Sequence, residues 1–272
     1  MAMPALGETE TRDYLAVATT GIFCRQGCPA PAPLARNASR VEGAKRALFS
    51  GYRPCLRCRP LDGAGDLTDA ERRRAERLHP ILSAARRATA RGRRRTGRDA
   101  VVVRLLATPL GPMLAGVTDR GVCLLEFSDR PMLPTQLAIL DRRLGLPVVA
   151  GRHELLDRLE AQLDEYFAGE RLAFDVPLLA PGSQFQRSTW RALATIPAGS
   201  TYTYEELAVA AGRPGAQRAA GTANGANRLS LLIPCHRVIR KTGETGNYGG
   251  GRWRKAWLLD HERRMATTLV PA

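Results

Sequence analysis

The part of the chain that begins at Val101 shows the regular hydrophobic patterns of a folded domain. Apolar runs over 101–106 and 113–127 predict strands, and Asp119-Arg120-Gly121 inside the second run predicts a hairpin turn. Apolar positions at helical spacing over 155–167 and 185–196 predict amphipathic helices. These patterns predict a small sheet with helices, followed by a helix-rich segment.

A capping box at Thr203-Tyr204-Glu205-Glu206 predicts the start of the next helix. This helix is expected to end at Gly212, and Pro214 suits the first turn of a further helix that reaches about Ala226. Two helices joined by a short turn are typical of a helix-turn-helix. The second helix carries mostly small side chains, so its backbone can approach another surface closely. Tight packing inside the protein is the alternative, and the long cation Arg218 favours DNA.

The first hundred residues have a different character. Residues 14–60 are short, proline-rich and cysteine-bearing, and such a segment buries too little core to fold without a staple. A capping box at Thr68-Asp69-Ala70-Glu71 predicts the start of a basic helical stretch, and Pro80 predicts a break in it. The Arg-rich stretch from Arg86 to Arg98 predicts a solvated linker, with a contact to DNA as the alternative.

Charge adds a clue to the partner. The chain has 41 Lys and Arg against 26 Asp and Glu, a net charge of +15. Such a balance favours a polyanion, because phosphate contacts supply sequence-independent affinity; a generally basic proteome is the alternative. The sequence has no apolar run long enough for a membrane span and no signal-peptide pattern at its start. We therefore expect a cytoplasmic protein, associated with the nucleoid if DNA is the partner.

The six cysteines fall into a cluster and two single positions. In a cytosolic chain, paired cysteines indicate a metal more than disulfides. Cys123, on a predicted strand, is expected to be a core residue. The remaining single cysteine is Cys235. The clustered residues, which can give tetrahedral sulfur coordination of one zinc ion, are Cys24, Cys28, Cys55 and Cys58.

The sequence around Cys235 predicts a nucleophile. A cysteine in an apolar run is often an inert core thiol, and that alternative applies to an isolated Cys-His pair. Here Pro234 interrupts the apolar run just before the cysteine, and His236 and Arg237 are costly neighbours for a purely structural thiol. Cationic or proton-accepting neighbours also favour the reactive thiolate.

The motif Pro234-Cys235-His236-Arg237-Val238 resembles the active-site motif of the O6-alkylguanine-DNA alkyltransferases. The likeness extends from about Val101 to Arg263 and is continuous from Phe185. Further matching positions, in the family's order and spacing, are Tyr204, Arg218, Asn227, Gly246-Asn247-Tyr248 and the terminal Trp257-Leu258-Leu259-Asp260-His261-Glu262.

The resemblance implies a role for each matching residue in the reaction. Cys235 accepts the alkyl group, His236 deprotonates it through a water, and Glu262 orients His236. Asn227 braces the turn before the cysteine, and Tyr204 helps to rotate the nucleotide and protonates the leaving guanine. The product is a stable thioether, so each molecule reacts once.

The resemblance also implies a DNA-binding surface and a pocket. The small-residue helix lies in the minor groove of double-stranded DNA, and Arg218 fills the gap that the extruded base leaves. Gly249 replaces a serine that several family members have, and the effect on alkyl size stays open. The residues implied in substrate or DNA binding are Arg218, Ala219, Ala220, Thr222, Arg237, Val238, Asn247, Tyr248 and Gly249.

The cysteine cluster resembles the zinc domain of Ada-type adaptive-response proteins, in a shortened form. The matching stretches are Thr19-Thr20-Gly21-Ile22-Phe23-Cys24-Arg25 and Gly51-Tyr52-Arg53-Pro54-Cys55-Leu56-Arg57-Cys58. In that family the first cysteine, here Cys24, is both a zinc ligand and a methyl acceptor from methylphosphotriesters. Only residues 62–100 join the two predicted repair domains, which leaves no room for the regulator's transcription segment.

The expected fold is α+β in five segments. A disordered tail (1–13) precedes a four-cysteine zinc domain (14–61) and a basic helical linker (62–100). A sheet-and-helix subdomain (101–180) then precedes a helix-turn-helix alkyl-acceptor domain (181–266). The expected function is single-turnover repair of O6-alkylguanine and O4-alkylthymine by a monomer, with a second transfer to Cys24 left open. The alternative is a DNA-binding protein that flags lesions or regulates transcription.

Overall fold

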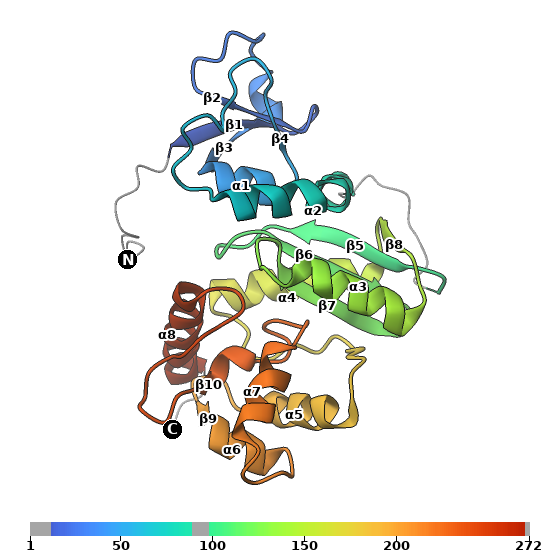
Figure 1. The fold of residues 1–272 in the computed structure, drawn as a ribbon, viewed down its shortest axis with the longest axis vertical. Coiled ribbons are helices and arrows are strands. Elements are labelled where there is room, and N and C mark those ends of the chain that lie inside the picture. Colours follow the sequence, from blue (N-terminus) through green and yellow to red (C-terminus); the bar gives the residue numbers. More distant parts are fainter. Residues whose placement is uncertain (1–11, 89–97, 270–272) are drawn as a thin grey trace. The chain divides into compact units, whose positions relative to one another are not determined.

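The computed structural model describes residues 12–88 and 98–269 and divides the chain into two compact units, Met1–Arg87 and Ala88–Ala272 (Figure 1). We call them the amino-terminal unit and the carboxy-terminal unit and describe each by itself. The expected disordered tail falls almost wholly outside the described residues, and the first strand begins at Asp13. Among the described residues, no helix combines the length and the apolar character that a membrane crossing requires.

The amino-terminal unit is built on a four-stranded sheet. Its elements before residue 60 are β1 (Asp13–Val17), β2 (Ile22–Arg25), a 3-10 turn (Ala35–Asn37), β3 (Ala38–Glu42), α1 (Ala44–Phe49) and β4 (Arg53–Pro54). The strand order is β3-β1-β2-β4, with β1 antiparallel to both of its neighbours. Phe23 and Phe49 are buried at its centre, and few other large apolar residues join them. This small core agrees with the expectation that the segment requires a staple.

Helix α2 (Asp69–Arg87) completes the amino-terminal unit, confirms one expectation and corrects another. The capping box is confirmed, since Thr68 N donates to Glu71 Oε2 over 2.9 Å. The predicted break at Pro80 is wrong, because the helix runs through it: the apolar face of α2, with Leu78 and Leu82 buried, packs along α1 and outweighs the one backbone hydrogen bond that proline removes.

The expected linker (62–100) belongs to the folded amino-terminal unit as far as Arg87. The Arg86 guanidinium lies 4.3 Å from the centre of the Tyr52 ring and donates to the Ala18 carbonyl over 3.1 Å. Of the expected linker, residues 89–97 lie outside the described ranges.

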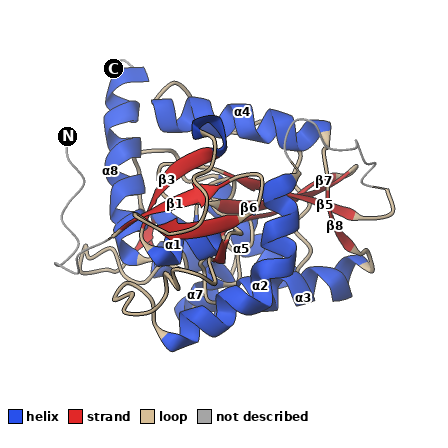
Figure 2. Ribbon diagram, turned by 90° about the horizontal axis from the view of Figure 1, so that it is seen from above, coloured by secondary structure: helices blue, strands red, loops and turns tan. Residues whose placement is uncertain are grey.

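The carboxy-terminal unit begins with a second four-stranded sheet. Its elements are β5 (Val101–Leu106), β6 (Met113–Thr118), β7 (Gly121–Phe127), α3 (Leu133–Leu144), β8 (Val148–Ala150) and α4 (Glu154–Ala168). The strand order is β7-β6-β5-β8. The predicted strands, the hairpin turn and the helix over 155–167 are confirmed, and Figure 2 distinguishes these helices from the strands. Cys123 is buried on β7, where its thiol donates to the Gly116 carbonyl, so the core prediction is confirmed.

A helix-rich segment follows the sheet. Its elements are α5 (Gln184–Ala194), β9 (Tyr202–Thr203), α6 (Tyr204–Ala210), α7 (Gln217–Gly225), a 3-10 turn (Cys235–Arg237), β10 (Val238–Ile239) and α8 (Arg252–Leu269). The capping box at Thr203 is confirmed. Helix α7 begins later than predicted, because Pro214 lies in a turn with Gly215, whose φ of +83° cannot continue into a helix.

Strand β7 connects the sheet with the segment that leads to Cys235. Leu125 N donates to the Arg228 carbonyl and Ser230 N donates to the Leu125 carbonyl, both over 2.8 Å. Residues 229–233 then form a tight turn, in which Leu231 has a φ of +70°. The cysteine therefore stands at the end of a turn that the sheet holds in place.

Candidate active site and metal centre

Cys235 lies at the wall of a cavity of about 380 Å³ in the carboxy-terminal unit. Pro234 ends the preceding turn, and Cys235 opens the short 3-10 turn. The residue is only 4% exposed, and the cavity gives it a route outward. The cavity is also lined by residues of the predicted site and of α7, namely Tyr204, Gly221, Gly225, Asn247, Tyr248 and Gly249.

Asn227 holds both the acceptor sulfur and the turn before it. Its Nδ2 donates to Cys235 Sγ over 3.1 Å and to the Ile233 carbonyl over 2.8 Å. Its Oδ1 accepts from Leu229 N over 2.9 Å. One buried side chain therefore fixes the sulfur relative to the backbone on both sides of the turn.

His236 and Glu262 form a buried hydrogen-bonded pair. The distance between His236 Nε2 and Glu262 Oε1 is 2.9 Å. Burial opposes ionisation of Glu262, but His236 and Arg237 more than offset it and hold the pKa of this carboxyl far below its usual value. A carboxylate there fixes the tautomer in which Nε2 carries the proton. His236 Nδ1 has no hydrogen-bond partner among the described residues, so it is the nitrogen left to accept a proton.

Arg237 and Val238 do not line the cavity, although both were expected to contact substrate or DNA. Arg237 is buried, and its Nε and Nη2 donate to the two Glu262 oxygens over 2.8 and 2.9 Å. Val238 is fully buried in the apolar core. Arg237 thus neutralises Glu262, and Val238 belongs to the same apolar core as Cys235.

Of the residues expected to contact DNA from α7, some are exposed to solvent and one is buried. Arg218, Ala219 and Thr222 are exposed on α7, whereas Ala220 is fully buried. Gly221 lies against the Tyr204 ring, where an added Cβ would be 3.5 Å from it. The small side chains of α7 therefore serve packing on one face and leave the other face open.

The pKa of the Cys235 thiol corrects another expectation. Burial raises this pKa, and the Asn227 amide and the positive charge of Arg130 oppose the increase. The neighbours in sequence, His236 and Arg237, are engaged with Glu262 instead. Deprotonation of the thiol therefore requires a base at the moment of reaction.

Sequence reasoning missed four buried polar residues around the site. Tyr166 donates to Glu262 Oε1 over 2.9 Å, and the Lys255 ammonium donates to the Val238 carbonyl. Arg130 lines the cavity and pairs with Glu126, which is fully buried on β7. The one sequence signal for these residues was the acidic Glu126 inside the apolar run 121–127.

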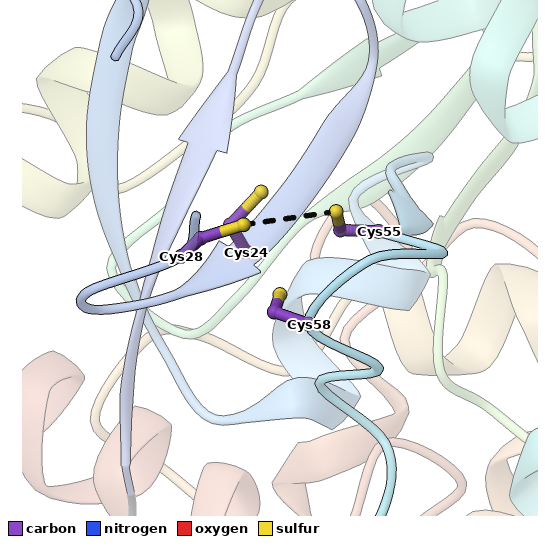
Figure 3. Close-up of side chains that lie close together, drawn as sticks. All are labelled: Cys24, Cys28, Cys55 and Cys58. Carbon is purple, nitrogen blue, oxygen red and sulfur yellow. Dashed lines mark hydrogen bonds between the residues drawn. The ribbon is translucent and has the colours of Figure 1, made fainter. Parts of the chain in front are cut away.

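The metal centre lies in the amino-terminal unit. Cys24 is on β2, Cys28 follows it, and Cys55 and Cys58 follow β4; Figure 3 shows the four side chains gathered around one centre. All four sulfurs lie within 4.8 Å of one another, and those of Cys28 and Cys55 are 3.9 Å apart. Tetrahedral coordination with Zn–S bonds of about 2.3 Å requires sulfur separations of about 3.8 Å, so the four thiols fit zinc with a small contraction.

Family models match both units of the chain. The metal binding domain of Ada matches residues 8–61. The ribonuclease-like domain of 6-O-methylguanine DNA methyltransferase matches residues 101–180, and its DNA binding domain matches residues 184–264.

Individual relatives agree with these matches. A methylated-DNA–protein-cysteine methyltransferase of Salmonella typhimurium is 42% identical over 166 residues, covering 58% of this chain and 92% of the relative. The regulatory protein ada of the same organism is 29% identical over 334 residues, covering 92% of each chain. The crystal structure of Mycobacterium tuberculosis OGT in complex with DNA is similar with a TM-score of 0.53 at 36% identity, covering 61% of this chain and 94% of the other. The chain therefore belongs to the 6-O-methylguanine DNA methyltransferase family and carries a metal-binding domain of the Ada type ahead of the methyltransferase.

Proposed function

We propose that the protein repairs DNA by moving an alkyl group from O6-alkylguanine, or O4-alkylthymine, to Cys235 in a single turnover. The observation that carries this proposal is a cysteine sulfur on the wall of a cavity that reaches α7, followed in the chain by His236, which pairs with the distant Glu262. The lesion-flagging and regulatory alternatives are not favoured, since the relative that matches over 92% of its own length at 42% identity is named a methyltransferase and the acceptor cysteine is present.

The chemistry follows from the hydrogen bonds. His236 Nδ1 takes the thiol proton through a water, and Glu262 stabilises the imidazolium that forms. The thiolate attacks the alkyl carbon, the S–C bond forms, and the C–O6 bond breaks with its electrons left on the base. Tyr204 gives its proton to the departing guanine. The thioether is stable, so the protein is consumed.

We propose that α6 and α7 form a helix-turn-helix that binds double-stranded DNA through the exposed face of α7. The alkyl carbon of a stacked base is out of reach of a sulfur within the protein, so the nucleotide must rotate out, at a cost of a few kcal/mol. Arg218 would fill the gap, while Tyr204, Asn247 and Tyr248 surround the base. A monomer suffices, because every proposed catalytic group lies in one chain, and DNA as partner implies association with the nucleoid.

The test compares two buried cysteines. Cys235→Ala should abolish methyl transfer from duplex DNA that contains O6-methylguanine, whereas Cys123→Ala should retain it, because Cys123 lies in the core on β7. Intact-mass spectrometry measures the transfer, and circular dichroism checks the fold. Transfer by the Cys235→Ala variant at the wild-type rate would refute the proposal.

A second transfer, from methylphosphotriesters to Cys24, is supported by a separate cavity of about 890 Å³ in the amino-terminal unit. Cys24, Thr20, Arg25 and Arg40 line it, so a phosphate could meet cations beside the sulfur. Zinc bound by the four cysteines would keep the sulfur as thiolate and screen its charge. Peptide mapping after exposure to DNA with methylated phosphates should find a methyl group on Cys24; a modified Cys235 alone would refute this second function.

A further inference from the structure

Arg130 comes from the sheet-bearing part of the carboxy-terminal unit and nevertheless lines the cavity of Cys235. It follows β7, and its side chain is only 5% exposed. A buried guanidinium is costly unless its charge and its N–H groups find partners. Glu126, four residues earlier, supplies the carboxylate and is itself fully buried.

The other N–H groups of Arg130 hold the backbone that leads to the acceptor cysteine. Nη2 donates to the Gly225 carbonyl over 2.6 Å, and Nη1 donates to the Asn227 carbonyl over 3.1 Å. Gly225 is the last residue of α7, so Arg130 satisfies a free carbonyl at that helix end with a positive charge. Gln136 Nε2 adds a second donor to the Asn227 carbonyl, also over 3.1 Å.

This clamp acts on Cys235 through one residue. The backbone of Asn227 is fixed by Arg130, and the side chain of Asn227 donates to the sulfur over 3.1 Å. Arg130 therefore helps to set the position of the Asn227 side-chain amide, which contacts the sulfur. Its positive charge also lowers the pKa of Cys235 against the effect of burial, whereas the Glu126 charge raises it.

Gly249 explains how the guanidinium fits. A Cβ at position 249 would lie 2.6 Å from Arg130 Nη2 and closer still to its Cζ and Nε atoms. Arg130 Nε is buried and has no hydrogen-bond partner among the described residues. The space beside Gly249 is thus occupied by a cation that any side chain at that position would displace.

We propose that Arg130 is a positioning residue for transfer to Cys235. It holds the backbone of Asn227 from the sheet-bearing part of the unit, and it places a positive charge beside the sulfur. The glycine at position 249 leaves the space that the Arg130 guanidinium occupies. This inference rests on the proposed function. It extends the reactive centre into a part of the molecule that contributes none of the predicted catalytic residues.

The test measures the pH dependence of Cys235 reactivity in two ways, by alkylation with iodoacetamide followed by peptide mapping and by methyl transfer from O6-methylguanine DNA. Arg130→Gln should slow both reactions about tenfold or more at neutral pH and move the half-maximal rate to higher pH, a tenfold change being one pKa unit. Arg130→Lys should recover most of the rate. Glu126→Gln should move the half-maximal rate to lower pH, because it removes the opposing charge. The charged groups that act on the sulfur are Arg130, Glu126 and Lys255, and the sulfur in turn raises the pKa of Tyr204 and Tyr248. His236 is its neighbour in the chain.

Arg104→Gln is the matched control. Arg104 is equally buried and paired with Asp157 and Glu160, but it does not line the cavity, so both profiles should stay at wild type. Opposite pH shifts in the Glu126 and Arg130 variants support the proposal. The proposal is overturned if Arg130→Gln has the same rates and the same pH midpoints as the Arg104→Gln control. It is also overturned if Arg130→Gln loses rate while its pH midpoints stay unchanged and Arg130→Lys does not recover the rate. If Arg130→Gln does not fold, Arg130→Lys and Glu126→Gln decide by the same midpoints. Absence of methyl transfer in the wild type would refute the proposed function instead, and the iodoacetamide profile would still test Arg130.

Discussion

The two sulfur sites of this protein are prepared for chemistry in opposite ways. Four sulfurs of the amino-terminal unit come together from strand β2 and the segments that follow β2 and β4, and their separations suit a single zinc ion. Cys235 is alone, and the hydrogen bonds that hold its site join distant parts of the chain, such as Arg130 and Asn227, which are 97 positions apart. A metal can therefore hold a sulfur cluster together in a small unit, whereas a single buried thiol is positioned by the packing of a whole domain.

Removal of zinc should produce the largest contrast between the two units. Because structural zinc contributes on the order of 10 kcal/mol of folding free energy, a chelator should unfold the amino-terminal unit. The carboxy-terminal unit has a large apolar core and should remain folded. Hydrogen exchange with peptide resolution measures this: residues 12–88 should lose protection and residues 98–269 should keep it. Equal protection of residues 12–88 with and without chelator would contradict the role of the metal.

Loss of the Glu262 carboxylate should give the next largest effect, confined to the other site. Glu262→Gln removes the group that stabilises the His236 imidazolium, so the rate of methyl transfer should fall about 100-fold or more, as for other general-base pairs. Tyr166→Phe removes only one hydrogen bond to Glu262 and should change the rate far less. Single-turnover kinetics measure both variants, and similar losses in both would argue against a specific role of the carboxylate.

The same carboxylate should also shape the acid stability of the carboxy-terminal unit. Its pKa in the folded state lies below the unfolded value of about 4.3, so the stability that it contributes is present above that pH and is lost as the pH falls. Glu262→Gln should therefore flatten the acid side of the stability profile. Urea unfolding at several pH values measures this, and profiles of identical steepness would contradict it.

Lys255 should give a smaller effect with the opposite pH dependence. Burial lowers its pKa to about 8, so protonation favours the unfolded chain, and stability falls as the pH drops from about 10.4 towards 8. Lys255→Met should therefore raise the free energy of unfolding at neutral pH by about 1–3 kcal/mol, with a smaller gain in alkali. Thermal unfolding at neutral and at alkaline pH tests this prediction. A gain in the free energy of unfolding that is larger at alkaline pH would contradict the lowered pKa of Lys255.

Pro80→Ala should give the smallest effect and only in the amino-terminal unit. Pro80 lies inside the continuous helix α2, and alanine restores one backbone hydrogen bond, which is worth about 1 kcal/mol. Slower hydrogen exchange of α2 should accompany it, with no change in the carboxy-terminal unit. Faster exchange of α2 would show that the helix depends on its proline.

Sequence patterns predicted those features that depend on neighbours along the chain. The hairpin before Gly121 and the capping boxes at Thr68 and Thr203 are local, and each is present in the structure. Each cysteine pair is also local in its spacing, and the two pairs meet across 26 intervening residues. The continuity of α2 through Pro80 depends on packing against α1, which no local rule contains. The start of α7 depends on the left-handed conformation of Gly215.

The site shows the same division. The motif around Cys235 placed the sulfur and His236 correctly beside Glu262 and Asn227, through the family resemblance. It could not reveal that the Arg237 guanidinium is hydrogen-bonded to Glu262, or that Arg130 is the cation that lines the cavity. Both facts arise from contacts between residues that are distant in sequence. The positive charges of Arg237 and Arg130 alone do not indicate which groups they contact.

Peptide mapping with an isotopically labelled methyl group decides whether the sulfur of Cys235 itself takes the alkyl group. The protein is mixed with a duplex that carries one O6-methylguanine with a labelled methyl, and its peptides are measured by mass spectrometry. Direct transfer predicts one labelled methyl on the peptide that contains Cys235, in proportion to the guanine restored. Restored guanine with an unlabelled Cys235 peptide, or a label on Cys123, would contradict it.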